Sequence, residues 1–265
     1  MMKKYTVLFL LLFVCLTSFA QAGLSISPGK IFFRNAQGTV ATQKVRIANP
    51  NDKAVEVGVS LGDWNYDQQG SNNVVEANSL STSASSWIQI LPNSYFVMEP
   101  NETKEVEVIL NVPQNLATDV PVHTAMIFFT QLNPGDALDE NGAAIKVTVR
   151  MGLKIYHADQ NNVESIEITD IKPNKGIDGS KLIEVFFQND GKLWSDGRLV
   201  ASIFNQQTGQ KTVLNTVDFY SLPNDLRKQS FVVPNELNKG TYTFIVQITY
   251  GKDNTVKVAE LDFTL

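Results

Sequence analysis

Apolar and polar residues alternate with a period of two through almost the whole chain after residue 23. The runs VEVGVSL at residues 55–61 and TYTFIVQITY at residues 241–250 illustrate this pattern. Because successive side chains of a β-strand point to opposite faces, such a run places one set of side chains in a core and the other in water. No comparable stretch of the sequence has the spacing of an amphipathic helix, so the pattern predicts an all-β protein.

Turn residues divide the alternating runs into short strands in both halves of the chain. The strands of the first half are expected at residues 24–33, 43–49, 54–62, 87–98 (broken at Pro92), 103–112, 122–131 and 144–156. Those of the second half are expected at residues 164–172, 181–189, 198–206, 211–220, 228–233, 241–250 and 255–264. About seven short strands per unit is typical of an immunoglobulin-like fold, so the sequence predicts two immunoglobulin-like β-sandwich domains in tandem.

A polar segment without periodicity, HADQNN at residues 157–162, separates the two groups of strands. We therefore predict a first sandwich domain at residues 23–157 and a second at residues 163–265. The length of 265 residues fits two domains of about 100–130 residues better than one. In both halves a strand, a Val-Pro pair, a short polar loop and a long apolar strand follow one another, which favours related topologies.

Residues 67–86 of the first half are rich in Asn, Ser, Gln and Gly and have little periodicity. This composition predicts a long loop of the first domain. A plain solvated connection is the favoured interpretation, and a mobile segment or a part of a binding rim is the alternative.

The amino terminus has the layout of a secretory signal peptide. Its sequence begins MMKK, continues with an apolar run over residues 5–16 and ends with AQA at residues 20–22. We predict that residues 1–22 are a signal peptide and that cleavage occurs before Gly23. The apolar run is shorter than the roughly 20 residues of a membrane span, and no later stretch approaches that length. The sequence thus predicts an exported protein of the periplasm or another part of the cell envelope, without an integral membrane segment.

Cysteine content and charge exclude several classes of function. The single cysteine, Cys15, lies in the predicted signal peptide, so the mature chain has no thiol for disulfides, for nucleophilic catalysis or for thiolate metal sites. The signal peptide also removes Lys3 and Lys4, which leaves 20 basic against 27 acidic residues. Nucleic acid is not an expected partner of so acidic a chain.

The sequence offers no catalytic constellation. Its two histidines, His123 and His157, lack acidic or hydroxyl partners at a recognisable spacing, and we interpret them as surface or strand-end residues. Gly-rich phosphate loops, nucleophile elbows and paired metal-binding histidines are also missing from the sequence. We therefore expect a binding protein, not an enzyme, with no cofactor and no metal site.

Three segments together resemble the amino-terminal domain of the PapD-like periplasmic chaperones, which act in pilus assembly. LSISPGKIFF at residues 24–33 resembles the first strand of that domain, and VRIANPN at residues 45–51 resembles the second strand and the following turn. AIKVTVRMGLKIY at residues 144–156 resembles the last strand, including its exit into a second domain.

This resemblance implies a partner-binding strand. In that family the last strand offers alternating apolar side chains that complete the unfinished fold of a subunit, a form of β-strand addition. The matching positions are Ile145, Val147, Val149 and Met151. The alternative is that these four residues simply face the core of their own sandwich.

The resemblance also implies an anion site. The family uses two basic residues in the cleft between the domains to anchor the C-terminal carboxylate of a subunit. The first falls near Pro28, which has no charge, with Lys30 close by, and the second falls at Arg150 or Met151, depending on the register.

The favoured hypothesis is a PapD-like chaperone or assembly factor for exported envelope or surface proteins of the fimbrial type. The alternative is a structural or adhesive envelope protein that binds wall or surface components through loops such as residues 67–86. A weaker similarity to the WxL-interacting surface proteins, which also pair two sandwiches, supports this alternative. Those proteins carry a C-terminal membrane helix, whereas this sequence ends in DFTL without one. The sequence sets neither the client nor the oligomeric state.

Overall fold

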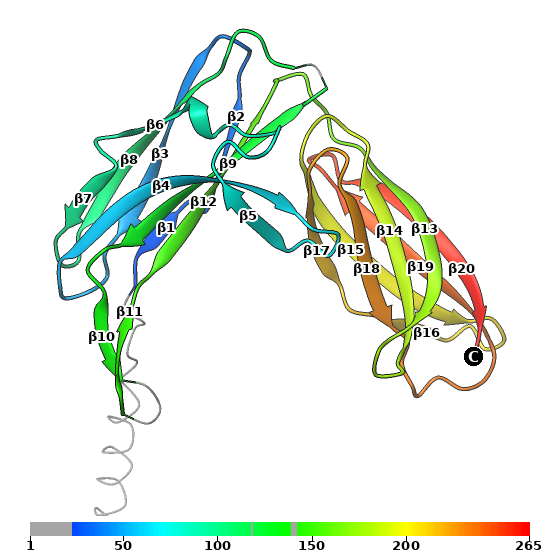
Figure 1. Ribbon diagram of the computed structural model, residues 1–265. Helices are drawn as coiled ribbons and strands as arrows, with labels where there is room; N and C mark the ends of the chain where they lie inside the picture. The colour runs from blue at the N-terminus through cyan, green and yellow to red at the C-terminus, as the bar shows by residue number, and fades with distance from the viewer. Residues whose placement is uncertain (1–22, 118, 139–141) are drawn as a thin grey trace, which may run out of the picture.

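The computed structural model describes residues 23–117, 119–138 and 142–265. The predicted signal peptide, residues 1–22, therefore lies outside the described residues. The described chain consists of β-strands, turns and one short 3₁₀ helix, η1 (Ser85–Trp87), which confirms the all-β prediction. Figure 1 shows two separate groups of strands joined by the segment between β12 and β13, so the molecule is bent.

The first group is a sandwich of two sheets. One sheet has the order β1-β3-β8-β6, formed by Ser25–Ser27, Val40–Ala48, Thr103–Asn111 and Ile88–Leu91. The other has the order β2-β12-β9-β4-β5, formed by Lys30–Arg34, Arg150–Ala158, Val122–Gln131, Val55–Tyr66 and Asn72–Glu76, and β7 (Tyr95–Met98) also pairs with β4. The hairpin of β10 (Gly135–Leu138) and β11 (Ala144–Val147) forms a separate two-stranded sheet.

The second group is also a sandwich, which confirms the prediction of two tandem domains of this class. Its smaller sheet has the order β13-β14-β18, formed by Ile166–Lys175, Lys181–Asn189 and Leu226–Val232. Its larger sheet has the order β16-β15-β19-β20, formed by Lys211–Val213, Ser195–Asn205, Thr241–Tyr250 and Thr255–Thr264, and β17 (Val217–Ser221) pairs with β15.

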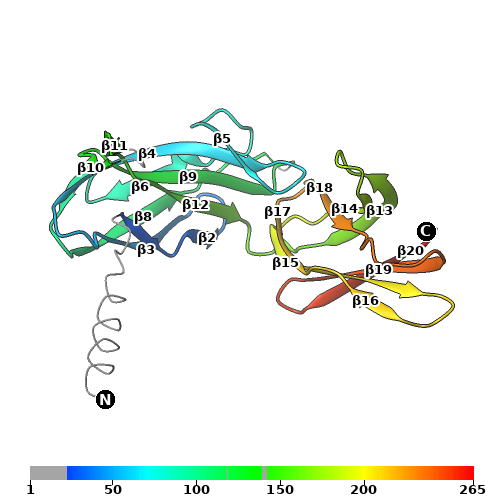
Figure 2. The same cartoon turned by 90° about the horizontal axis from the view of Figure 1, so that it is seen from below.

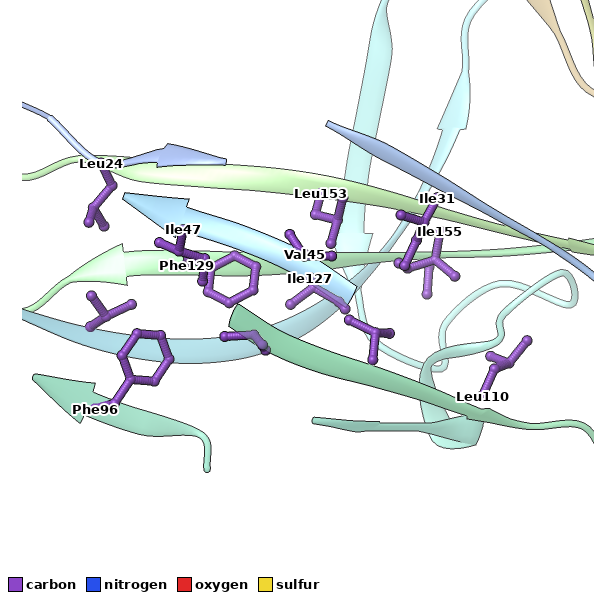
Figure 3. Close-up of a cluster of buried hydrophobic side chains, with 14 of the residues drawn as sticks. Leu24, Ile31, Val45, Ile47, Phe96, Leu110, Ile127, Phe129, Leu153 and Ile155 are labelled. Carbon is purple, nitrogen blue, oxygen red and sulfur yellow. The ribbon is translucent and has the colours of Figure 1, made fainter. Parts of the chain in front are cut away.

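Period-two burial builds the core of each sandwich. In the first domain, Leu110 of β8 and Val45 of β3 face Ile127 of β9 and Leu153 of β12 across the space between the sheets, as Figure 3 shows. Outward positions on the same strands, such as Glu105, remain exposed. Burial of alternate aliphatic side chains is the main stabilising contribution, because a chain with a single cysteine has no internal disulfide to add to it.

The first predicted strand, residues 24–33, is divided between the two sheets. The break occurs at Pro28 and Gly29, which separate β1 from β2. β1 pairs antiparallel with β3, whereas β2 pairs parallel with β12. This switch places Lys30 at the start of β2, opposite Lys154 of β12.

The loop predicted for residues 67–86 is wrong in part, because the segment contains β5, which pairs with the end of β4. A buried carboxylate orders the residues that follow. Asp63 accepts hydrogen bonds from the backbone N–H groups of Ser79 (2.9 Å) and Leu80 (3.1 Å) and from the hydroxyls of Ser83 and Ser85 (both 2.7 Å). The polar side chains of this stretch therefore order the backbone through hydrogen bonds. A pattern of alternating apolar residues cannot predict such bonds.

Polar contacts tie the two domains together. The β4–β5 turn reaches the second domain, where the N–H of Lys228 donates to the carbonyl of Gln68 (2.8 Å). In the connecting segment, Arg34 Nη2 donates to the carbonyls of Gln160 (2.6 Å) and Asn162 (3.0 Å). The views in Figures 1 and 2 agree that β5 and its turn extend toward β17 and β18.

An apolar cluster also contains residues of both domains. Its buried members are Trp64, Val122, Met126, Phe128, Tyr156, Ala158, Leu193 and Leu222, with Tyr66 and Trp194 packed against them. This cluster covers the outer face of β9, which explains why β9 is buried on both faces. None of the helices in the described part of the chain has the length and hydropathy needed to cross a bilayer.

Candidate functional site

The strand that the sequence singled out lies at an open edge of its sheet. The predicted strand 144–156 is broken at residues 148–149 into β11 and β12. On one side β12 pairs with β9 along its whole length, but on the other side β2 covers it only from Lys154 to Ala158. Within the described part of the chain, residues 150–153 and β11 thus have no strand partner on that second side. On that side, the backbone groups of residues 150–153 are open to another strand.

An apolar stripe follows this edge out of the domain. Leu153 is fully buried in the core, and Met151 and Val149 are half-buried against it. Val147 and Ile145 continue the same alternation beyond the sandwich and are 44% and 41% exposed. The structure therefore divides the four predicted residues, with two packed on their own core and two presented to solvent.

A groove of about 460 Å³ lies beside the exposed half of the stripe. Val147 and Val149 form one side, and residues 51–55 together with Gln131 and Asn133 form much of the rest. The groove therefore offers both apolar surface and amide groups next to the open edge.

Two lysines lie side by side where the open edge meets the second domain. Lys30 of β2 and Lys154 of β12 are register partners. Lys30 Nζ lies 3.3 Å from the ring centroid of Tyr220 in the second domain. Lys154 Nζ donates to Tyr66 Oη (3.0 Å) and to Asn72 Oδ1 (2.5 Å).

A third cation, Arg227 of β18 in the second domain, lies close to Lys154, and these three side chains form a cation cluster. Its Cζ lies 5.3 Å from the ring centroid of Tyr66, and its Nη1 donates to the carbonyl of Tyr220. The side chain is almost fully buried, and its Nε has no hydrogen-bond partner. Gly70 of the β4–β5 turn makes room for it, because a Cβ there would lie 1.8 Å from Arg227 Nη2.

Lys30 and Arg227 both act on the charge of Lys154, and the carboxyls of Asp225 and Asp67 act on that of Arg227. Burial, together with the nearby Lys30 and Arg227, lowers the pKa of Lys154 to about 8. Burial also raises the pKa of the neighbouring Asp225 carboxyl to about 6. Among the described residues, the structure records no ion pair for any of the three cations. A cluster of cations without ion pairs favours an anion that can accept several charge-assisted hydrogen bonds, and a carboxylate has this property.

Aromatic rings of both domains line a small cavity of about 10 Å³ beside the cation cluster. Phe32 stacks on Tyr156 with centroids 4.8 Å apart and contacts Trp194 of the second domain at 5.0 Å. Burial raises the pKa of both Tyr66 and Tyr156, so their hydroxyls remain neutral hydrogen-bonding groups.

The basic residues expected from the sequence have different positions. Lys30 lies in the cation cluster, whereas Arg150 is exposed outside it with its Cζ 3.7 Å from the ring centroid of Phe128. Lys154 and Arg227 were missed. The sequence signal for Lys154 is a cation within the apolar run LKIY, but its pairing with Lys30 depends on the break at Pro28.

The interpretation of the histidines as surface residues is wrong. His123 and His157 lie near strand ends, as expected, but are only 5% and 2% exposed. His123 of β9 and His157 of β12 are register partners, one pair from the end of the two strands. Both imidazoles are buried because the ring of Trp87 packs against them.

No protein-family model matches the sequence, and a search of curated proteins gave no match. Solved structures do resemble the fold. The class 5 fimbriae chaperone CfaA aligns with a TM-score of 0.50 and 11% identity over 91% of this chain and 98% of its own. A chain of the CsuC–CsuE chaperone–tip adhesion subunit complex of Acinetobacter baumannii aligns with a TM-score of 0.47 and 12% identity, over 90% of this chain and 98% of its own.

A chain of the Salmonella enterica complex between SafA pilin and the SafB chaperone aligns with a TM-score of 0.45 and 10% identity, over 94% of this chain and 99% of its own. The CfaA alignment confirms the expected resemblance to PapD-like chaperones at the level of the fold alone. The chain has the tandem two-sandwich architecture of the fimbrial chaperone CfaA.

Proposed function

We propose that the protein is an exported chaperone or assembly factor that holds a protein subunit of the cell envelope through two contacts. A strand of the subunit adds to the open edge of β11 and β12, and the subunit's C-terminal carboxylate binds at the cation cluster. The observation that carries the proposal is the convergence of Lys30, Lys154 and Arg227 at the end of this unpaired edge.

Strand addition follows from the two properties of the edge. Unpaired backbone N–H and C=O groups provide hydrogen bonds that do not depend on the client's sequence. Ile145 and Val147 provide apolar side chains that complete a client's open core, because they already project beyond their own core. Val149 and Met151 anchor the strand to the donor domain.

Carboxylate binding fixes the register of the added strand. The cation cluster lies at the end of the open edge, so a chain terminus held there sets which client residues face Val147 and Ile145. Lys154 and Lys30 would supply flexible ammonium donors, and Arg227 a fixed guanidinium.

The client class and the location rest on two supports. The fold resembles that of the fimbrial chaperone CfaA, which favours a fimbrial-type subunit as the client. The predicted signal peptide, residues 1–22, favours the periplasm or another part of the envelope. Binding of this kind requires no catalytic group and no cofactor.

The alternative, an adhesive protein that binds through residues 67–86, has less support. This segment contains β5, and its turn contacts Lys228 of the second domain. Pairing with β4 and the contact with the second domain hold this segment in place, although many of its residues remain exposed.

The test is capture of exported proteins by the chain purified from its host envelope, with bound proteins identified by mass spectrometry. Val147→Asp places a charge where the client's core would close, and we expect it to lower capture at least tenfold. Val40→Asp is the matched control, because Val40 is also an exposed strand valine, at 63% exposure, but lies on β3. Equal capture by both folded variants would contradict strand donation.

A further inference from the structure

The hairpin of β10 and β11 leaves the first sandwich through residues 132–134, directly after the end of β9. Figure 1 shows that this hairpin projects beyond the sheet that contains β9 and β12. Its returning strand, β11, carries Ile145 and Val147, the two exposed residues of the apolar stripe. The contacts of residues 132–134 therefore set where this half of the stripe lies.

The side chain of Asn133 takes the place of a backbone group in the ladder between β4 and β9. The regular pairing ends at Val57 and Gln131. One further backbone bond follows, from the N–H of Leu132 to the carbonyl of Glu56 (2.8 Å). In a regular antiparallel pair, the N–H of Glu56 would return this bond to the carbonyl of Leu132. It donates instead to Asn133 Oδ1 (2.8 Å).

The next position of the ladder shows why a side-chain donor is needed there. In the same register Pro134 would lie opposite Ala54, and a proline has no backbone N–H. Asn133 Nδ2 supplies the missing donor, 2.9 Å from the carbonyl oxygen of Ala54. The amide of Asn133 therefore keeps the edge of β4 hydrogen-bonded while the backbone turns away into β10, which begins at Gly135.

Gln131 joins both ends of the hairpin to the same point. Its backbone N–H donates to the carbonyl of Val149 (2.8 Å), where the chain returns from β11. Its side-chain Nε2 donates to the carbonyl of Asn133 (2.7 Å), where the chain leaves for β10. Asn133 itself is half-buried and lines the groove beside the stripe together with Val147 and Val149. The base of the hairpin is thus held from both strands.

We propose that Asn133 is a positioning residue for strand addition, because its side-chain amide fixes the direction in which the β10–β11 hairpin leaves the sandwich. This inference rests on the proposed function, since the position of Ile145 and Val147 matters only if they enter a client's open core. A hairpin held at one angle presents both side chains without a further loss of conformational freedom on binding, which raises affinity. Without the amide, only a fraction of the molecules would have the hairpin at the angle that a client needs.

The first part of the test measures the position of the hairpin. The chain that begins at Gly23 contains no cysteine, so Ala144→Cys on β11 and Thr42→Cys on β3, both at exposed positions, introduce the only sites for nitroxide labels. Double electron–electron resonance is expected to give one narrow distribution of distances between the labels. Asn133→Ala is expected to widen this distribution.

The second part compares capture of exported proteins by folded variants. Asn133→Ala is expected to lower capture about fivefold. The thermal unfolding temperature should remain unchanged, because the hairpin lies outside the hydrophobic core. Asn111→Ala is the matched control, since Asn111 Nδ2 also donates to a backbone carbonyl, that of Trp87 (3.3 Å), but lies on β8. It should change neither the distances nor the capture.

Two results would overturn the role of Asn133: an unchanged distance distribution, or a wider distribution with capture equal to that of Asn111→Ala. Val147→Asp distinguishes this failure from a failure of the proposed function. If Val147→Asp lowers capture and Asn133→Ala does not, only the positioning role is wrong. If neither variant lowers capture, strand donation itself is wrong, and the positioning role is lost with it.

Discussion

At the scale of single residues, the charge of Lys154 lowers the stability of the fold but supports the proposed binding of a carboxylate. Burial and two neighbouring cations lower its pKa to about 8, below the ordinary value near 10.5. Between these two values the unfolded chain binds more protons than the folded chain, so stability rises as the pH increases from about 8 to 10.5. The charged ammonium at pH 7 therefore reduces stability, and the proposed function gives a reason for its presence.

We expect Lys154→Met to raise the thermal unfolding temperature at pH 7 and to weaken binding of a peptide with a free C-terminal carboxylate about tenfold or more. In the original protein this binding should weaken as the pH rises through about 8 and beyond, because Lys154 loses its proton. In the variant this pH dependence should disappear. Fluorescence polarisation with the C-terminal peptide of a captured subunit measures the affinity and its pH dependence. The C-terminal amide of the same peptide is the control. A variant that keeps the pH dependence would contradict the assignment.

Asp63 has a structural role at the same scale. It is fully buried, and its carboxylate receives four hydrogen bonds from residues 79–85. Asp63→Ala removes the acceptor for all four donors and should lower the free energy of unfolding by about 3 kcal/mol in urea titrations. Asp253→Ala, at an exposed turn, is the control and should change it by less than about 0.5 kcal/mol. Similar losses in both variants would contradict this role.

At the scale of the elements, hydrophobic periodicity locates strands that have a buried face. The strands predicted at 122–131, 181–189, 241–250 and 255–264 have the observed bounds, because each alternates or is apolar throughout. β5 and β10 were missed, since NNVVE and GDAL have no such pattern. The breaks at Pro28 and at residues 148–149 depend on which strand pairs with which, and that is a tertiary property.

The candidate site also shows that the sequence predicts features within one segment but not the pairing of distant segments. The apolar positions of residues 145–151 could be predicted because they follow from alternation within one segment. The cation cluster could not, because Lys30, Lys154 and Arg227 are brought together by the pairing of β2 with β12 and by the contact between domains. The histidine pair was misjudged for the same reason, since 34 residues separate positions 123 and 157 in the chain but the register places them opposite each other.

The β4–β5 hairpin is an element whose turn can be tested. Gly70 has a φ of +90°, and a Cβ at this position would collide with the Arg227 guanidinium. Gly209 also has a positive φ, +71°, but nothing lies within 4 Å of its Cβ position. Gly70→Ala should therefore lower the unfolding temperature more than Gly209→Ala, and it alone should weaken carboxylate binding. Equal effects of the two variants in thermal melts would show that backbone conformation, not the contact with Arg227, decides the outcome.

At the scale of the whole molecule, aromatic contacts hold the two sandwiches at one angle. Trp194 of the second domain lies 5.0 Å from Phe32 and 5.5 Å from Tyr156, and its ring is 5.7 Å from Arg34 Cζ. Interfaces between domains of one chain allow relative motion unless they are large and apolar. The bend of the molecule therefore depends on a small number of rings.

Trp194→Ala is expected to broaden the distribution of distances in small-angle X-ray scattering and to separate the unfolding of the two domains in calorimetry. Tyr95→Ala, an exposed aromatic residue on β7, is the control and should leave the scattering profile unchanged. An unchanged profile for the Trp194 variant would mean that the Gln68–Lys228 and Arg34 hydrogen bonds are sufficient to hold the angle.

The position of Arg227 has a thermodynamic consequence. Its guanidinium lies against the β4–β5 turn of one sandwich and belongs to the other, and its charge is part of the proposed anion site. Binding of an anion at the proposed site and the rigidity of the bend between the sandwiches are then coupled. Such a coupling is reciprocal. If a client carboxylate binds at the proposed site and rigidifies the bend, a change that loosens the bend should weaken client binding by the same free energy.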